Sequence, residues 1–292
     1  LLKDDPPPKA VVVQKVKHRV ANPLKPFYSD EPSLLYWATL RGVDLNKKPK
    51  TKPPPKPLLP PFESIFKDDE QYTVPQRPYY IELAKAIIAW IKSNKFPFTF
   101  VPFSGPGLSG QMTDTVDRIN ENTPMFSKRV SDCESENGMR DIINDIMNFL
   151  GERGIMTMLR FRETVGSALV LPPGPNQLLD SFRVFHDPAS ANPLTVGARA
   201  LSKHCVRSKD TWWGTEKNTT VYQKNVHAEK VLRKILHAAA WMNVHTLPHD
   251  IYVLEIREKN GYGARWLATS PYHFRGFLEP QMADGHEKGW KH

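Results

Sequence analysis

Residues 251–269 read IYVLEIREKNGYGARWLAT, and this stretch decides the fold class. Ile251 to Glu258 alternates apolar and polar side chains, as a strand on the surface of a core does. The dipeptide Asn260-Gly261 follows, which favours the type I′ turn between two antiparallel strands. Tyr262 to Thr269 can then return as the partner strand. The stretch therefore predicts an antiparallel β-hairpin.

Helical patterns precede this hairpin and one further strand follows it. Thr195 can cap a helix that runs to about Val206. A longer helix is predicted from about Gln223 to Asn243, because apolar residues recur there at helical spacing. Phe274 to Leu278 can add a third strand to the hairpin. The last part of the chain, residues 176–292, is therefore predicted to be an α+β module.

The middle of the chain, residues 79–175, is predicted to mix helices and strands. Apolar periodicity indicates helices over residues 79–94 and 136–151. Residues 98–103 read as a strand or extended run, and residues 155–161 and 168–171 read as strands. Pro172-Pro173-Gly174-Pro175 breaks the pattern and predicts a domain boundary.

Residues 1–78 have the composition of an extended arm. Of the 27 prolines in the chain, 15 precede Tyr79. Proline removes backbone donors and favours the polyproline II conformation, so we expect no packed core in this segment. The predicted fold class is therefore α+β, with an extended proline-rich N-terminal arm, a helical middle region and a C-terminal α+β module that contains a β-hairpin.

Positive charge is concentrated at the two ends of the chain. The formal net charge is +9, and residues 1–62 hold 12 Lys or Arg against 5 Asp or Glu. Residues 195–292 hold 15 against 9, whereas residues 63–194 hold 13 against 17. Such a distribution suits contact with RNA or an anionic lipid surface. A compositional bias without a specific partner explains it equally well.

Two cysteines, Cys133 and Cys205, are too few for a disulfide framework or a thiol metal site, which favours a reducing compartment. No apolar run is long enough to predict a membrane-spanning helix. The chain begins with Leu1, which would fit the removal of a targeting segment. These features together predict the mitochondrial matrix, or the matrix side of the inner membrane, with a plastid as the second choice.

No motif in the chain specifies a catalytic residue, a metal site or a cofactor. Gly105 to Gly110 matches G-x-G-x-x-G, but Pro106 removes an amide and Gln111 to Asp114 do not begin a convincing apolar helix. The element His227-Ala228-Glu229 lacks the two cysteines that a zinc deaminase needs. A metal site among His237, His245 and His249 is disfavoured, because Pro248 interrupts any helix there.

A basic constellation in the C-terminal module is the best candidate binding site. Three cations recur every four residues on the first predicted helix, two more follow on the second, and arginines neighbour aromatic residues in the strands. Cations bind phosphates, and aromatic and arginine side chains stack on bases, so RNA is the favoured ligand. The predicted RNA- or anion-binding residues are Arg199, Lys203, Arg207, Lys230, Lys234, Arg265 and Arg275.

The C-terminal residues resemble an uncharacterised eukaryotic protein family that is also present in plants and protists. The similar stretches are residues 192–204, residues 261–266, and the ending from Phe274 to Pro280 with Gly285-His286 and residues 289–292. No activity is known for that family, so the resemblance implies no catalytic residues. It implies that the last hundred or so residues form a discrete module.

These observations together predict a non-catalytic subunit of a large mitochondrial assembly, with a mitochondrial ribosomal protein that contacts rRNA as the leading interpretation. Its partners would be neighbouring protein subunits. One alternative is an accessory subunit of mitochondrial ATP synthase or of a respiratory complex. Another is an enzyme that binds a small anionic substrate in the C-terminal module, with a site among His204, Arg207, Arg265, Arg275 and His286.

Overall fold

The computed structural model describes residues 72–103, 113–207, 211–215 and 219–281. The arm predicted for residues 1–78 therefore lies almost wholly outside the described residues, as does the glycine-rich stretch before Thr113. The described residues contain six helices and four strands, in the order α3 (Tyr79–Ser93), α4 (Thr113–Ser131), α5 (Glu136–Met158), α6 (Pro175–Arg183), α7 (Val196–Arg207), α8 (Val221–His237), β1 (Ala239–Leu247), β2 (Ile251–Glu258), β3 (Gly263–Leu267) and β4 (Phe274–Leu278).

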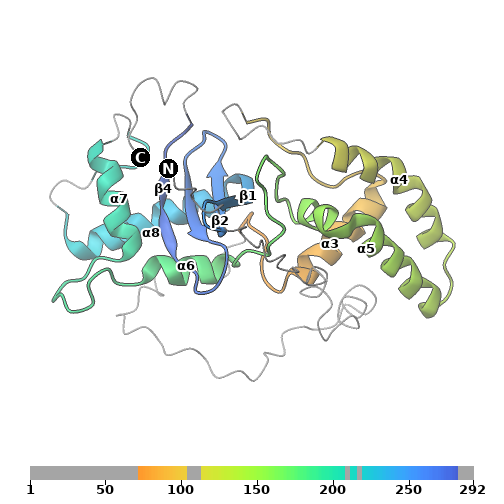
Figure 1. Cartoon of the computed structure of the whole chain (residues 1–292), viewed down its shortest axis with the longest axis horizontal. Helices are drawn as coiled ribbons and strands as arrows, with labels where there is room; N and C mark the ends of the chain where they lie inside the picture. The colour runs from red at the N-terminus through yellow and green to blue at the C-terminus, as the bar shows by residue number, and fades with distance from the viewer. Residues whose placement is uncertain (1–71, 104–112, 208–210, 216–218, 282–292) are drawn as a thin grey trace, which may run out of the picture.

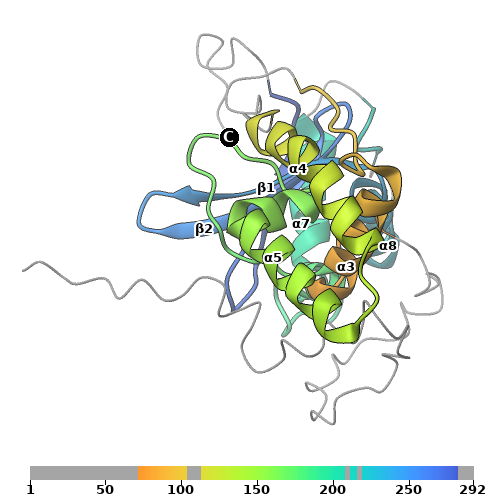
Figure 2. The same ribbon diagram turned by 90° about the vertical axis from the view of Figure 1, so that its right-hand side faces the viewer.

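Helices and strands are segregated in space, as the predicted α+β class requires. Helices α3, α4 and α5 gather at one end of the molecule, and the sheet lies at the other end with α6, α7 and α8 around it (Figure 1). Seen from the helical end, the tip of the β1–β2 hairpin projects beyond these helices (Figure 2). None of the helices in the described ranges combines the length and the apolarity needed to cross a membrane.

The helical end is built around Trp90 of α3, which is fully buried. Its indole N–H donates a hydrogen bond of 2.7 Å to the Thr123 hydroxyl of α4. The rings of Phe126 and Phe149, from α4 and α5, lie 5.8 Å and 6.5 Å from the tryptophan ring. A buried indole needs a partner for its N–H. Trp90 therefore joins all three helices, and the predicted helix over residues 79–94 is confirmed.

The four strands form one antiparallel sheet in the order β1-β2-β3-β4. The hairpin predicted around Asn260-Gly261 is confirmed as β2 and β3, and the strand predicted at Phe274–Leu278 is β4. One face of the sheet is apolar and forms the core of this end of the molecule. Its side chains are those of Met242, Val244, Leu254, Ile256, Ala264, Trp266, Phe274 and Phe277.

Helices α6, α7 and α8 pack against this sheet. The Trp266 indole N–H donates to the Leu178 carbonyl of α6 at 3.3 Å, and Phe182 of α6 meets Phe274 edge-on at 4.9 Å. Thr195 caps α7 as predicted, since its hydroxyl accepts a hydrogen bond from the Ala198 amide. The helices thereby shield the apolar face of the sheet from water.

Several predicted elements are wrong. The helix predicted from Gln223 to Asn243 ends at His237, and the chain continues as β1. Residues 155–158 complete helix α5 instead of starting a strand, and residues 168–171 form no strand. Helix α4 begins at Thr113, where no helix was expected. It was missed because its sequence is mostly polar and contains Pro124, which ordinarily disfavours a helix interior.

The segment that precedes α3 binds to the C-terminal end of α8. The Thr73 amide donates to the Leu236 carbonyl at 3.3 Å, and its hydroxyl donates to the His237 carbonyl. The Tyr72 ring stacks on His237 at 4.6 Å. Residues far upstream therefore contact the C-terminal module directly. The division into 1–78, 79–175 and 176–292 stays a prediction.

A buried carboxylate, Glu229 of α8, joins three segments of the chain. It accepts hydrogen bonds from Arg183 of α6 at 2.6 Å and 3.1 Å, and from Arg233 at 2.9 Å and 3.0 Å. Arg233 also donates to the Tyr72 hydroxyl at 2.5 Å. The Glu229 side chain is 2% exposed, so its charge is neutralised by arginines rather than by water.

Gly197, in the first turn of α7, is required by the close approach of a neighbouring ring. A Cβ atom at this position would lie 2.0 Å from a ring carbon of Phe182, and Phe182 is itself buried. Because a packed aromatic ring cannot move aside freely, Gly197→Ala is expected to lower the free energy of unfolding by about 1–3 kcal/mol. Urea unfolding followed by circular dichroism measures this.

Lys203→Ala is the matched control for that substitution, since Lys203 lies on the same helix and is exposed. It should change the free energy of unfolding by less than about 0.5 kcal/mol. Equal stabilities for Gly197→Ala and the unsubstituted protein would contradict the contact described here.

Candidate functional site

The second face of the sheet carries a cluster of polar side chains, most of which are buried. In an antiparallel sheet, residues directly opposite each other place their side chains on the same face. Asn243 of β1 pairs with Glu255 of β2, which pairs with Arg265 of β3. Two more pairs of β1 and β2 lie on this face, one on each side of Asn243 and Glu255. They are Trp241 with Arg257, and His245 with Val253. We call this surface, with Asn243, His245, Glu255, Arg257 and Arg265, the polar face.

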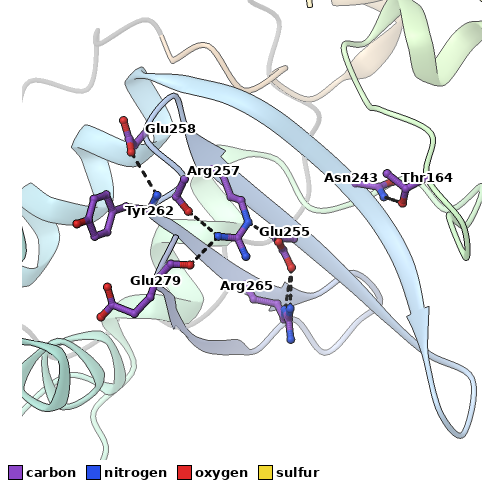
Figure 3. A network of polar contacts seen from close by, with 9 residues as sticks. Thr164, Asn243, Glu255, Arg257, Glu258, Tyr262, Arg265 and Glu279 are labelled. Carbon is purple, nitrogen blue, oxygen red and sulfur yellow. Dashed lines mark hydrogen bonds and ion pairs between the residues drawn. The ribbon is translucent and has the colours of Figure 1, made fainter. Parts of the chain in front are cut away.

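Glu255 is the centre of the polar face, between two arginines (Figure 3). Its Oε1 accepts from Arg257 Nε at 2.6 Å, and its Oε2 accepts from Arg265 Nη2 at 2.7 Å and Nε at 3.1 Å. Burial alone would raise the pKa of this carboxyl, but the charges and hydrogen bonds of Arg257 and Arg265 lower it below its ordinary value. Glu255 is therefore ionised at neutral pH.

The two arginines have different surroundings. The Arg257 side chain is 3% exposed and also donates to the carbonyls of Gly261 at 2.5 Å and Glu279 at 2.9 Å. Gly263 leaves room for it, because a Cβ there would lie 2.7 Å from Arg257 Cγ. The Arg265 side chain is 30% exposed. The Arg257 guanidinium is thus buried and hydrogen-bonded within the protein, whereas the Arg265 guanidinium is accessible to an anion from solvent.

His245 lies on the same face, diagonal to Glu255 across β1 and β2. Its side chain is half-buried, and burial is the main cause that lowers its pKa below 6.5. The nearby charge of Glu255 raises this pKa, and those of Arg265 and Arg257 lower it. Within the described part of the chain, no hydrogen bond engages the imidazole nitrogens. The ring is therefore neutral at pH 7 and able to accept a proton.

The loop of residues 161–168 lies against the outer edge of β1, and we call it the β1-edge loop. Asn243 Nδ2 donates to the Thr164 hydroxyl at 2.7 Å, and the Ser167 hydroxyl donates to Asn243 Oδ1 at 2.9 Å. Ser167 also forms an antiparallel bridge with His245. Figure 3 shows Thr164 beside Asn243. A second segment thereby fixes the strand that carries the histidine.

A second polar cluster lies between α7 and the end of β4. Oε1 of Glu279 lies 2.7 Å from His204 Nδ1 and accepts from the indole N–H of Trp213 at 2.8 Å. The Trp213 carbonyl lies 2.7 Å from His227 Nε2. The Glu279 backbone also binds Arg257, so this cluster adjoins the polar face. The side chains of this cluster are mostly buried among aromatic rings. A ligand can therefore reach them less easily than it can reach Arg265.

The predicted binding residues are distributed over different parts of the module. Of this set, Arg265 belongs to the polar face, and Lys234 lies 4.2 Å from the Trp212 ring centroid. The other five are exposed on α7, α8 and β4, namely Arg199, Lys203, Arg207, Lys230 and Arg275. Their role in binding stays a prediction.

The structure does not gather the histidines proposed for a metal site, and it places two of the residues proposed for a small-anion site in different ion pairs. His237 stacks on Tyr72 at the end of α8, His245 lies in β1, and His249 lies in the turn that follows. The described residues contain no group of three His, Cys, Asp or Glu side chains arranged to hold a metal ion. For the small-anion alternative, His204 pairs with Glu279 and Arg265 pairs with Glu255, while His286 lies outside the described residues.

The sequence patterns did not single out Glu255 or Asn243, and they suggested His245 only as a disfavoured metal ligand. The alternation of β2 was recognised, but alternation alone places Glu255 on a solvent-facing surface. The signal available was the Glu-x-Arg spacing at Glu255 and Arg257, since two residues apart on a strand share a face. His245 was assigned to a loop, because the helix predicted up to Asn243 left no strand there.

Comparison with known proteins gives one family match. The family model described as the CdiA C-terminal tRNase toxin domain matches residues 186–279, which is less than half of the chain. The matched segment contains α7, α8 and all four strands, and with them the polar face. No curated protein and no solved structure matches the chain.

This match overturns the interpretation drawn from the sequence. The resemblance to an uncharacterised eukaryotic family is wrong, because residues 186–279, which contain most of the stretches that carried it, match a bacterial toxin family. The prediction of a non-catalytic, structural mitochondrial ribosomal protein is wrong for the same reason, since the matched family consists of nucleases. The match also contradicts two further predictions, namely rRNA and the subunits of a large complex as partners, and a mitochondrial or plastid location. Residues 186–279 are similar to a tRNA-cleaving toxin domain.

Proposed function

We propose that the C-terminal module is a ribonuclease that cleaves tRNA, with the polar face of the sheet as its active site. The observation that carries this proposal is the match of residues 186–279 to the tRNase toxin family. The polar face supports it, because it brings a neutral imidazole, a partly exposed guanidinium and a fixed carboxylate together in that segment.

The chemistry of RNA cleavage fits these groups. The ribose 2′-oxygen attacks the adjacent phosphorus, the bond from phosphorus to the 5′-oxygen breaks, and a 2′,3′-cyclic phosphate forms. The 2′-hydroxyl must lose a proton to a base, and the leaving 5′-oxygen gains one, here from water. His245 is a basic group on this face whose ring nitrogens make no hydrogen bond with the described residues, and its lowered pKa keeps it neutral at pH 7. Glu255 is a poorer base, because two arginines hold both of its oxygens.

Arg265 has the position and the charge to bind the phosphate under attack. A guanidinium stabilises the negative charge that accumulates on the phosphate oxygens in the transition state. Glu255 holds Nε and Nη2 of Arg265, which orients the group, and Nη1 has no hydrogen-bond partner among the described residues, so it can bind a ligand. The carboxylate therefore positions the cation instead of neutralising its function.

Arg265→Ala is expected to slow tRNA cleavage about a hundredfold, because the transition state loses its phosphate ligand. The assay is cleavage of purified tRNA by the full chain, followed on denaturing gels. Lys259→Ala is the matched control, since Lys259 is an exposed cation on the β2–β3 turn, and it should cleave at the unsubstituted rate. Intact tRNA after incubation with the unsubstituted protein would refute the proposed function.

A further inference from the structure

The β1-edge loop lies upstream of the segment that matches the nuclease family, so nothing in that match assigns it a role. We propose that this loop is a part of the nuclease site that positions His245 for catalysis, through the hydrogen bonds of Thr164 and Ser167 to Asn243. The inference rests on the proposed function. It makes Thr164, Ser167 and Asn243 positioning residues, which act through His245 and do not touch the reacting atoms.

The backbone of the loop is joined to β1 at three successive points. The Arg162 amide donates to the Met242 carbonyl at 2.7 Å, and the Ala168 amide donates to the Val244 carbonyl at 2.7 Å. The Thr246 amide donates to the Gly166 carbonyl at 3.0 Å. These bonds enclose residues 242–246 of β1. The strand that carries His245 is therefore held on both sides, by β2 and by the loop.

Side chains lock the loop to the same stretch. The Asn243 amide is 1% exposed, and the loop hydroxyls engage both its nitrogen and its oxygen. The Ser167 hydroxyl also accepts from the Thr164 amide at 2.8 Å, which closes the turn of the loop. A buried amide with both ends satisfied permits one arrangement only. Asn243 is two residues from His245 on the same face, so this arrangement fixes where the imidazole lies.

Arg162 anchors the start of the loop in the protein interior. It is 5% exposed, and its guanidinium donates to the carbonyls of Val101 at 2.5 Å and Ala240 at 3.0 Å. Burial lowers the pKa of Arg162 to about 10, which still leaves it charged at neutral pH. The other charged residue of the loop, Glu163, pairs with Arg153 of α5 at 3.4 Å. The loop is thus attached to α5 and β1 at once.

A loose supporting shell misplaces a catalytic group, and a small displacement of that group lowers the rate of the chemical step without changing substrate affinity. A loop with a merely structural role would affect stability and leave the rate per folded molecule unchanged. The two possibilities therefore differ in kcat, in KM and in the pH dependence of the rate. The charged groups that face His245 are Glu255, Arg257 and Arg265, and the loop substitutions leave all three in place.

The test compares Thr164→Val with Thr164→Ser in the full chain. Valine has the shape of threonine but gives Asn243 Nδ2 no acceptor, whereas serine keeps the hydroxyl. We expect Thr164→Val to lower kcat for tRNA cleavage about tenfold with KM changed less than about twofold, and Thr164→Ser to retain most of the rate. We expect the midpoint of the acid limb of the pH–rate profile to move toward 6.5 in Thr164→Val, because the loosened loop lets water reach His245.

Ser167→Ala is the second variant, in case Thr164→Val lowers the folded fraction. The same loss of kcat is expected for it. Ser181→Ala is its control, because it removes a serine hydroxyl away from the loop, one that donates a hydrogen bond of 2.9 Å to the Leu178 carbonyl in α6. Unchanged kcat in Thr164→Val and Ser167→Ala, with tRNA cleavage intact, would overturn the positioning role and leave the proposed function standing. Failure of the unsubstituted protein to cleave tRNA would overturn both.

Discussion

Substitution of His245 by alanine is expected to lower the rate of tRNA cleavage by about 10²–10⁴-fold, which is the usual contribution of a general base. The imidazole is the base proposed for the 2′-hydroxyl, and no hydrogen bond within the described residues occupies its nitrogens. Single-turnover cleavage of tRNA measures the chemical step directly. The 5′ fragment should end in a 2′,3′-cyclic phosphate, which periodate leaves intact because that end has no free cis-diol.

The pH dependence of the rate of tRNA cleavage is an independent test of the role of His245. A base acts only when it is deprotonated, so the rate should rise with pH through the pKa of His245. Burial lowers this pKa, and the half-maximal rate is therefore expected below pH 6.5. His273→Ala is the matched control, because His273 is exposed near the start of β4 and should leave the rate unchanged. Equal rates for His245→Ala and the unsubstituted protein would refute this role.

Glu229→Gln is expected to lower the free energy of unfolding by about 3–5 kcal/mol. Glutamine keeps the size of the side chain but removes the charge that neutralises Arg183 and Arg233. The Arg233 side chain is 5% exposed and that of Arg183 is 20% exposed, so water can replace little of the lost interaction. Urea unfolding of the full chain, monitored by tryptophan fluorescence, measures the change.

Glu163→Gln is the matched control for that experiment. Glu163 also pairs with an arginine, Arg153, but its side chain is 37% exposed and the atoms lie 3.4 Å apart. Half-exposed pairs of this kind contribute about 0–1 kcal/mol, so a small effect is expected. A loss of less than about 1 kcal/mol in Glu229→Gln would show that the buried cluster does not hold α6, α8 and Tyr72 together.

Local signals were sufficient to predict the hairpin and the N-terminal cap of α7. The Asn260-Gly261 turn and the alternation on either side of it depend only on neighbouring residues, and so does the cap at Thr195. The boundary between α8 and β1 was missed for the opposite reason. Ala238, Ala239 and Ala240 suit a helix, and only pairing with β2 and with the β1-edge loop makes the following residues a strand.

The candidate site was predicted only in part. Arg265 was identified because a cation beside tryptophan suggests nucleic-acid binding. Its partner Glu255 was not, because the sequence read it as one polar residue on a strand. The pairing of Glu255 with Asn243 and Arg265 depends on the register of three strands, and contacts from Thr164 and Ser167 arise some 80 residues upstream. Such long-range contacts leave no periodic signal in the chain.

The bonds between the β1-edge loop and β1 also bear on self-association. An outer strand ordinarily presents unpaired amides and carbonyls on which a strand of another molecule can assemble. Here the carbonyls of Met242 and Val244 and the amide of Thr246 are already taken by the chain itself. Variants that release the loop should therefore form intermolecular sheets and precipitate more readily on storage at high concentration.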